Sequence, residues 1–117
     1  MRGIIEINLK NLNDNLNYFK KNLPHGARLA AVVKADAYGH GAVGVAKAIR
    51  EKVDYFVTAS AEEAEEVREL TKKPILCLAA LSESEATRCV FKGIEISVSS
   101  ESDVRMLAAI SERTGVC

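Results

Sequence analysis

The sequence has no excess charge of either sign and no long apolar run. Its 117 residues contain 16 Lys and Arg against 16 Asp and Glu, so the formal net charge at pH 7 is zero. A nucleic-acid-binding domain normally gathers a basic excess on one face, whereas Lys20-Lys21 and Lys72-Lys73 lie in separate segments. No stretch approaches the roughly 18–20 apolar residues of a membrane span, and the N-terminal stretch MRGIIEINLKNL has too few for a signal peptide. We therefore expect a cytoplasmic protein that binds neither nucleic acid nor a membrane.

Cysteine is also scarce. Cys77, Cys89 and Cys117 are odd in number, widely spaced and free of any C-x-x-C pair. This spacing indicates neither a disulfide framework nor a zinc site, so no metal site is expected. The three thiols are expected to be ordinary buried side chains.

What the chain does have is an alternation of short apolar runs with amphipathic segments. Its composition, 48% apolar and 27% charged, is typical of a soluble globular protein. Apolar residues at three- and four-residue steps predict a helix over residues 9–23, and Ile4, Ile5 and Ile7 predict a short strand before it. Strands are then predicted to begin near residues 29, 55, 75 and 94, and a helix comes after each of them.

Hydroxyl residues mark the starts of three of these helices. In each case a serine is followed three residues later by an acid, the pattern of a capping box. The pairs are Ser60–Glu63, Ser82–Glu85 and Ser100–Asp103. The last pair has Asp in place of Glu and predicts a weaker box. The helix that it begins is expected to turn Val104, Leu107 and Ala108 inward.

The order of these elements predicts the fold class. No Asn-Gly hairpin signal lies between the strands, and connections through helices make neighbouring strands parallel. Four βα units can form an open sheet or half of an eight-stranded barrel, a fold of about 250 residues. Gly115 resembles a helix C-cap, after which a further strand would begin. We expect an α/β fold: the first four βα units of a TIM-type (β/α)8 barrel, incomplete, with a short N-terminal strand and helix.

A lysine stands at the end of the first barrel-like strand, in the run AVVKADAYGHG at residues 31–41. Alternation places Ala30, Val32 and Lys34 on one face, and the carboxyl ends of parallel strands are where loops carry chemistry. An ammonium beside Ala and Val is costly to desolvate, which favours the neutral amine that condenses with aldehydes. The other interpretation is a lysine whose stem lies along the sheet while its head reaches water.

The same stretch also fits a nucleotide-binding pattern. GHGAVG at residues 39–44 has the G-x-G-x-x-G spacing, and Glu62 lies about 20 residues further on. In that pattern the first glycine comes directly after the strand, whereas KADAY separates Val33 from Gly39. A dinucleotide site is therefore the weaker alternative.

The run AVVKADAYGHG, followed by AVGVAKAI, closely resembles the pyridoxal-phosphate attachment signature of the alanine racemase family. EINLKNLNDNLNYFKKNL resembles the family's opening strand and helix, and ASAEEAEEVRE and PILCLAAL resemble its second and third βα units. The resemblance covers nearly all of the chain. It implies that residues 1–117 are the N-terminal half of a pyridoxal-phosphate-binding barrel domain, without the C-terminal half-barrel and β domain.

Carried over by position, the resemblance implies roles for four residues. Lys34 would attach pyridoxal 5'-phosphate and would also be the catalytic base on one face of the substrate. Tyr38 would give its phenol to the cofactor phosphate, and Val32 and Leu78 would be apolar walls beside the cofactor ring. The alternatives are a half-buried loop tyrosine and two ordinary core side chains.

The activity implied by the resemblance is interconversion of L-alanine and D-alanine by two-base proton transfer. In the family the second base is a tyrosine of a partner subunit, so we expect a homodimer when intact and a piece of 117 residues that is inactive by itself. The alternative is a non-catalytic pyridoxal-phosphate-binding protein with a related barrel, and the ADAYGHG loop favours the racemase. Within that loop, Asp36 and His40 are expected to stabilise the backbone.

Overall fold

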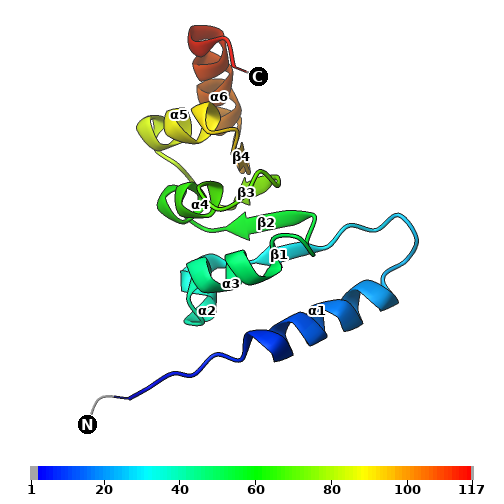
Figure 1. The fold of residues 1–117 in the computed structure, drawn as a ribbon. Coiled ribbons are helices and arrows are strands. Elements are labelled where there is room, and N and C mark those ends of the chain that lie inside the picture. The colour runs from blue at the N-terminus through cyan, green and yellow to red at the C-terminus, as the bar shows by residue number, and fades with distance from the viewer. Residues whose placement is uncertain (1–2, 117) are drawn as a thin grey trace.

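The computed structural model describes residues 3–116, which form a four-stranded parallel sheet with helices between the strands (Figure 1). The strands are β1 (Ala30–Val32), β2 (Tyr55–Thr58), β3 (Ile75–Cys77) and β4 (Glu95–Ile96). The helices are α1 (Leu9–Asn22), α2 (Lys34–Tyr38), α3 (Ala42–Ile49), α4 (Ala61–Arg68), α5 (Glu83–Phe91) and α6 (Glu101–Thr114). The strands lie in the order β1-β2-β3-β4, so each helical connection joins neighbouring strands. The predicted βα units and their parallel pairing are confirmed.

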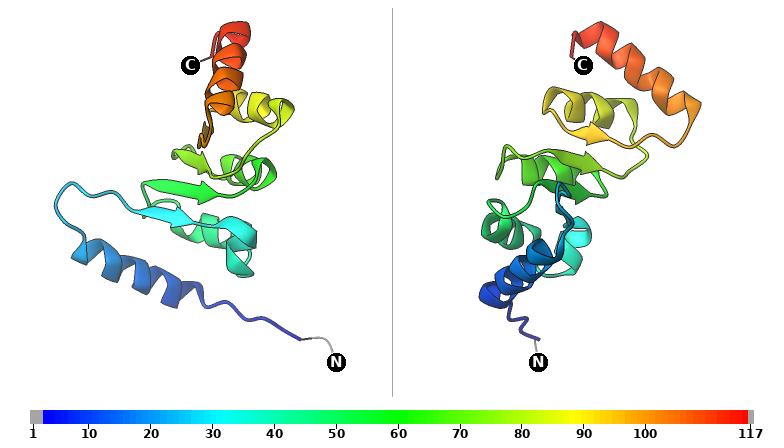
Figure 2. Two further views of the ribbon diagram at one scale, coloured as in Figure 1. Left: turned by 180° about the vertical axis from the view of Figure 1, so that it is seen from behind. Right: turned by 90° about the vertical axis from the view of Figure 1, so that its right-hand side faces the viewer.

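The core lies between the sheet and the helices α3, α4 and α5, which stack along one side of the strands (Figures 1 and 2). Ala31, Phe56 and Ile75 are aligned across three strands and belong to this layer, where Phe56 and Ile75 are fully buried. Alanines supply much of the helical side of the contact. The fully buried ones on the three helices are Ala46, Ala61, Ala64 and Ala86. Their short side chains let the helices approach the sheet closely.

Helix α1 lies beside the β1 end of the sheet and packs against α3 (Figure 2). Its Leu16 is buried in the core, and Leu12, Leu16 and Phe19 line an open apolar pocket of about 430 Å³ between α1 and β1. Helix α1 confirms the helix predicted over residues 9–23.

The prediction of a short N-terminal strand is wrong. Residues 3–8 have no regular secondary structure, and Ile4 is 94% exposed. In the part of the chain that the structure describes, no strand lies beside this segment, so its backbone has no ladder to join. Three isoleucines give a strong strand propensity, but propensity without a pairing partner does not form a strand.

The inward face of the last helix was also predicted incorrectly. Val104 and Ala108 are exposed and Leu107 is half-buried, whereas Ile110 is fully buried. Helix α6 packs against α5, so only the stripe that faces α5 is covered.

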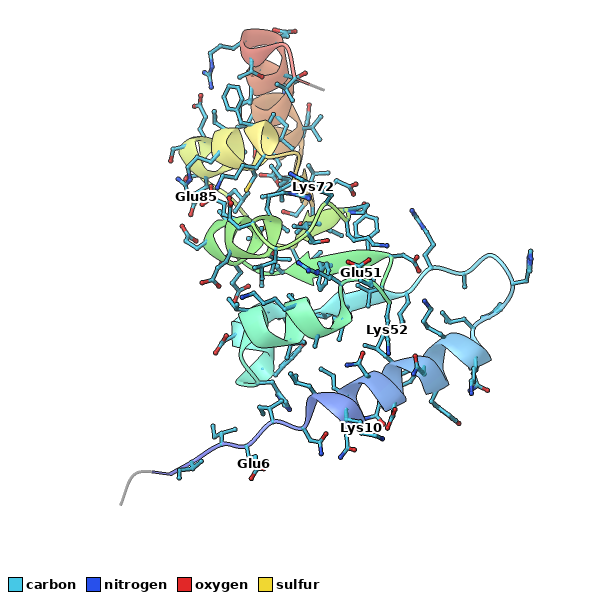
Figure 3. All side chains as sticks on the ribbon, in the orientation of Figure 1. Glu6, Lys10, Glu51, Lys52, Lys72 and Glu85 are labelled. Atoms are coloured by element: carbon cyan, nitrogen blue, oxygen red, sulfur yellow. The ribbon has the colours of Figure 1, made fainter. Side chains whose placement is uncertain are left out.

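The helix starts agree with the serine pattern at α5 and α6. Glu85 lies at the first turn of α5 (Figure 3) and forms both halves of a capping box with Ser82. Ser100 and Asp103 do the same at α6. The predicted weakness of the second box is not seen in its geometry, because Asp103 accepts from the backbone N–H groups of both Ser99 and Ser100 at 2.9 Å. The hydrogen bond from the Ser82 hydroxyl lowers the pKa of the Glu85 carboxyl, and the one from the Ser99 backbone N–H lowers the pKa of the Asp103 carboxyl. The Ser60–Glu63 pair forms only one half of a capping box, and the Glu63 carboxylate belongs to the candidate functional site.

The two cysteines within the described residues, Cys77 and Cys89, are free and buried, as expected. Burial raises the pKa of both thiols, that of Cys89 to about 11, so they stay protonated at neutral pH. Cys117 lies outside the described residues. Between residues 3 and 116, no three His, Cys, Asp or Glu side chains are grouped as metal ligands. In the same range, no helix combines the length and apolarity needed to cross a membrane.

Arg68 joins two loops at the amino-terminal end of the sheet. Its Nη1 donates to the carbonyl oxygens of Thr71 and Lys73 at 3.1 and 3.0 Å, and its Nη2 donates to that of Gly93 at 3.2 Å. These carbonyls precede β3 and β4, so one guanidinium holds the entry to both strands.

Replacing Arg68 by methionine should therefore destabilise the fold. Arg68→Met keeps most of the apolar stem but leaves the loop carbonyls without their charged donor, and we expect a loss of about 2 kcal/mol in the free energy of unfolding. Arg105→Met is the matched control, because exposed Arg105 pairs with Glu101 one turn away and should change stability by less than about 0.5 kcal/mol. Urea denaturation measures both variants. Equal midpoints for the two would contradict the role given to Arg68.

Candidate functional site

Lys34 lies at the carboxyl end of β1, on the rim of the sheet. Strand pairing aligns Val32 with Val57 and Val57 with Leu76. Continuing this register by two residues brings Lys34, Ala59 and Leu78 to the same level. The backbone supports the extension, since Val33 N–H donates to Val57 O and Leu78 N–H donates to Thr58 O, both at 2.9 Å.

The alternation predicted for this strand is observed. Val33 points into the helix-covered core and is 2% exposed, whereas Val32, on the opposite face, is 44% exposed. Leu78, at the end of β3, is 49% exposed, and Lys34 is half-buried. The residues expected to contact the cofactor ring are thus accessible at the rim rather than enclosed in the core.

The segment after Lys34 has an unusual backbone. Ala35, Asp36, Ala37 and Tyr38 have φ values of 51°, 52°, 53° and 56°, so α2 is a left-handed turn rather than an ordinary helix. For L-residues with a Cβ this conformation costs about 1–2 kcal/mol per residue. Four consecutive non-glycine residues in it require compensating contacts from their surroundings.

Backbone hydrogen bonds close the turn on itself. Ala37 N–H donates to Val33 O at 2.9 Å, and Gly39 N–H donates to Ala35 O at 3.1 Å. Gly41 N–H then donates to Asp36 O at 2.9 Å, which brings the end of the turn back to its start. Gly41 itself has φ 85° and ψ 95°, outside the region available to residues with a Cβ.

Asp36 and His40 stabilise this loop, as expected. The Asp36 carboxylate accepts from Ala42 N–H at 2.7 Å and so caps the start of α3, where Gly41 has no side chain to do so. The His40 ring nitrogen Nδ1 lies 3.1 Å from Ala37 O. The first contact ties the left-handed turn to α3, and the second ties it to the short connection before α3.

Glu63 supplies the contact from outside the loop. Ser60 Oγ accepts from Glu63 N–H at 3.1 Å, which is one half of the predicted capping box. The other half is absent, because the Glu63 carboxylate accepts from Ala35 N–H at 2.7 Å and from Ala59 N–H at 2.9 Å. One side chain therefore bridges the loops after β1 and β2. The serine pattern predicts that Glu63 caps its own helix, and no local signal indicates that its carboxylate reaches the preceding loop.

The structure brings together only some of the predicted site residues. Val32 and Tyr38 both line the pocket between α1 and β1, and Tyr38 is 61% exposed. Leu78 comes directly after β3, two strands from β1 in the sheet, and does not line this pocket. Lys34 comes two residues after the end of β1, and Val33 between them has a ψ of 20°, so the strand alternation ends before Lys34.

Four parallel βα units in sequential order are the arrangement of part of a TIM-type barrel, a fold whose active sites lie at the carboxyl ends of the strands. The model of the family "Alanine racemase, N-terminal domain" matches residues 7–116. The chain thus belongs to the alanine racemase family through its N-terminal domain.

Individual relatives agree with this assignment. The alanine racemase of Streptococcus pyogenes serotype M5 (strain Manfredo) is 37% identical over 98 residues, which are 83% of this chain and 27% of that protein. The solved alanine racemase of Clostridium difficile 630 superposes with a TM-score of 0.87 at 38% identity, covering 93% of this chain and 29% of that one. The alanine racemase of E. faecalis gives a TM-score of 0.82 at 31% identity, covering 87% and 28%. The chain thus spans a little more than a quarter of its curated relatives.

The backbone of Gly41 provides a test of the loop geometry. Gly41→Ala places a Cβ where no atom lies within 4 Å, so any effect comes from the positive φ, and we expect a loss of about 1–3 kcal/mol in stability. Gly44→Ala is the control, because Gly44 lies inside α3 with equally open space and should gain about 0.5–1 kcal/mol. Thermal unfolding of both variants gives the comparison. A stabilised Gly41→Ala variant would show that the loop does not hold this conformation.

Proposed function

We propose that this chain forms the pyridoxal-phosphate-binding part of an enzyme that interconverts L-alanine and D-alanine. The observation that carries the proposal is Lys34, a half-buried primary amine at the carboxyl end of β1, within a family-matched segment whose backbone is held by several hydrogen bonds. A rim position on a parallel sheet is where such a fold carries reactive groups.

The side chains on the rim suit this cofactor. A primary amine is the group that condenses with an aldehyde, and Lys34 provides it. Val32 and Leu78 present exposed apolar side chains at the carboxyl ends of β1 and β3. An aromatic ring needs apolar surface beside it, and a phosphate needs hydrogen-bond donors such as the exposed Tyr38 hydroxyl.

Each residue then has a defined task. Lys34 would hold the cofactor through Nζ, and its amine would remove or return a proton on one face of the substrate α-carbon. The Tyr38 hydroxyl would donate to the phosphate, and Val32 and Leu78 would contact the ring and exclude water. When bound, pyridoxal phosphate supplies an electron-withdrawing ring that acidifies the α-hydrogen of an attached amino acid.

Racemisation needs a second base on the opposite face, and we propose that it comes from a partner subunit of a cytoplasmic homodimer. The 117 residues by themselves are then expected not to racemise alanine at a useful rate. Conversion of L-alanine to D-alanine by the purified 117-residue chain, lost in Lys34→Ala, would contradict this part of the proposal.

The attachment itself can be tested on the chain directly. Pyridoxal phosphate is added, the carbon–nitrogen bond formed with loss of water is reduced by borohydride, and digested peptides are weighed by mass spectrometry. We expect the adduct at Lys34 to exceed that at any other lysine by at least about tenfold. Lys34→Ala should remove it.

Lys47→Ala is the matched control, since Lys47 is an exposed lysine on the next helix and its loss should leave the Lys34 adduct unchanged. Labelling spread evenly over the lysines would contradict the proposal. A selective Lys34 adduct in an assembled protein that never racemises alanine would instead indicate a non-catalytic pyridoxal-phosphate-binding protein.

A further inference from the structure

Three helices in this chain begin with the same arrangement, a serine and an acid three residues later, and one of them uses the acid differently. At α5 and α6 the carboxylates of Glu85 and Asp103 return to the N–H of their own cap residues, Ser82 and Ser100. At α4 the carboxylate of Glu63 leaves its cap residue and accepts from Ala35 and Ala59. The local pattern is the same in all three, so the difference at α4 has a cause outside the helix.

That cause lies in the turn that Glu63 contacts. Ala35 is the first of four consecutive non-glycine residues with left-handed φ values, and it directly follows Lys34. Departures from local rules in natural sequences tend to occur at strained or functional sites. Here the Glu63 carboxylate departs from the capping-box pattern and contacts the strained segment next to Lys34, the proposed cofactor lysine.

The contacts on either side of Lys34 form a clamp on its backbone. On the amino-terminal side, Val33 N–H donates to Val57 O at 2.9 Å. On the carboxyl-terminal side, Ala35 N–H donates to the Glu63 carboxylate at 2.7 Å. Both acceptors belong to the second βα unit, so β2 and α4 together hold the backbone on either side of Lys34.

A carboxylate suits this position for a specific reason. Two backbone N–H groups from different loops converge on Glu63, one on each oxygen, and an ionised carboxylate is an acceptor at both. An amide side chain has one acceptor oxygen and an NH₂ group that can only donate. Glutamine at this position would therefore leave at least one of the two N–H groups without a partner.

We propose that Glu63 is a positioning residue for Lys34. It holds the left-handed turn after β1 against the loop after β2 and thereby aims the Lys34 amine toward the cofactor aldehyde. This inference rests on the proposed function for the identity of the group that Lys34 meets. The clamp itself depends only on Glu63, Ala35 and Ala59.

The matched pair of variants is Glu63→Gln and Glu85→Gln. Both replace the acid at the same position of a helix start, next to a serine cap that stays in place. Only the first touches the Lys34 turn. Glu63→Asp is a further variant, which keeps the charge but is one carbon shorter and so cannot reach both loops equally well.

Hydrogen exchange tests the clamp without any cofactor. In Glu63→Gln, the amides of Ala35, Ala37 and Ala59 should exchange about tenfold faster than in the unaltered protein, because the turn opens more often. In Glu85→Gln they should not change. Equal exchange of these amides in both variants would overturn the clamp.

Adduct formation then tests positioning. The initial rate of the borohydride-trapped pyridoxal phosphate adduct at Lys34 is measured relative to that at Lys47 in the same molecule, which corrects for reagent and for global unfolding. We expect this ratio to fall about tenfold in Glu63→Gln, to fall in Glu63→Asp as well, and to stay unchanged in Glu85→Gln.

The two measurements separate the possible outcomes. A faster exchange with an unchanged Lys34 ratio would overturn the positioning role, and Glu63 would then only stabilise the loop. If the unaltered protein shows no selective Lys34 adduct, the proposed function fails instead, and the exchange result still decides whether Glu63 holds the turn. If Glu63→Gln does not fold, Glu63→Asp carries the same comparison.

Discussion

The parallel pairing of β1 with β2 is the constraint on which the site depends. It aligns Val32 with Val57, provides the acceptor for Val33 N–H, and brings the end of β1 level with Ala59. The loops after these two strands are therefore close enough for a single carboxylate to reach both. Without this register, Lys34 would still end a strand, but its backbone would have no second element to hold it.

Much of the architecture could be predicted because it depends on local periodicity. The βα alternation, the helix over residues 9–23, two complete capping boxes and the position of Lys34 just after β1 all result from short-range patterns. The errors arose where the surroundings of a segment, rather than its own sequence, determine its structure. Ile4 has strand propensity but no strand beside it among the described residues, and Val104 lies on a face of α6 that α5 does not cover.

The left-handed turn could not be derived from propensity for the same reason. Positive φ is uncommon for residues with a Cβ, and Asp36 is the one residue of the four whose type adopts it more readily, so the sequence of this turn gives little local indication of its conformation. The conformation is imposed by partners such as Glu63, which lies 28 residues further along the chain than Ala35. Resemblance to the alanine racemase family identified the segment as important, while the physical contacts show what keeps it in place.

The alanine-rich contact between the helices and the sheet has a consequence for how this domain can change over evolutionary time. Where Ala61 and Ala64 of α4 are fully buried, the separation of the two layers is set by single methyl groups. Glu63 lies between these two alanines, so a larger residue at either would push its carboxylate away from Ala35 as well as disturb the core. The substitutions that such interior alanines tolerate are therefore limited by the geometry of the rim as well as by the core. Substitutions at the alanines and at the rim residues cannot accumulate independently of each other.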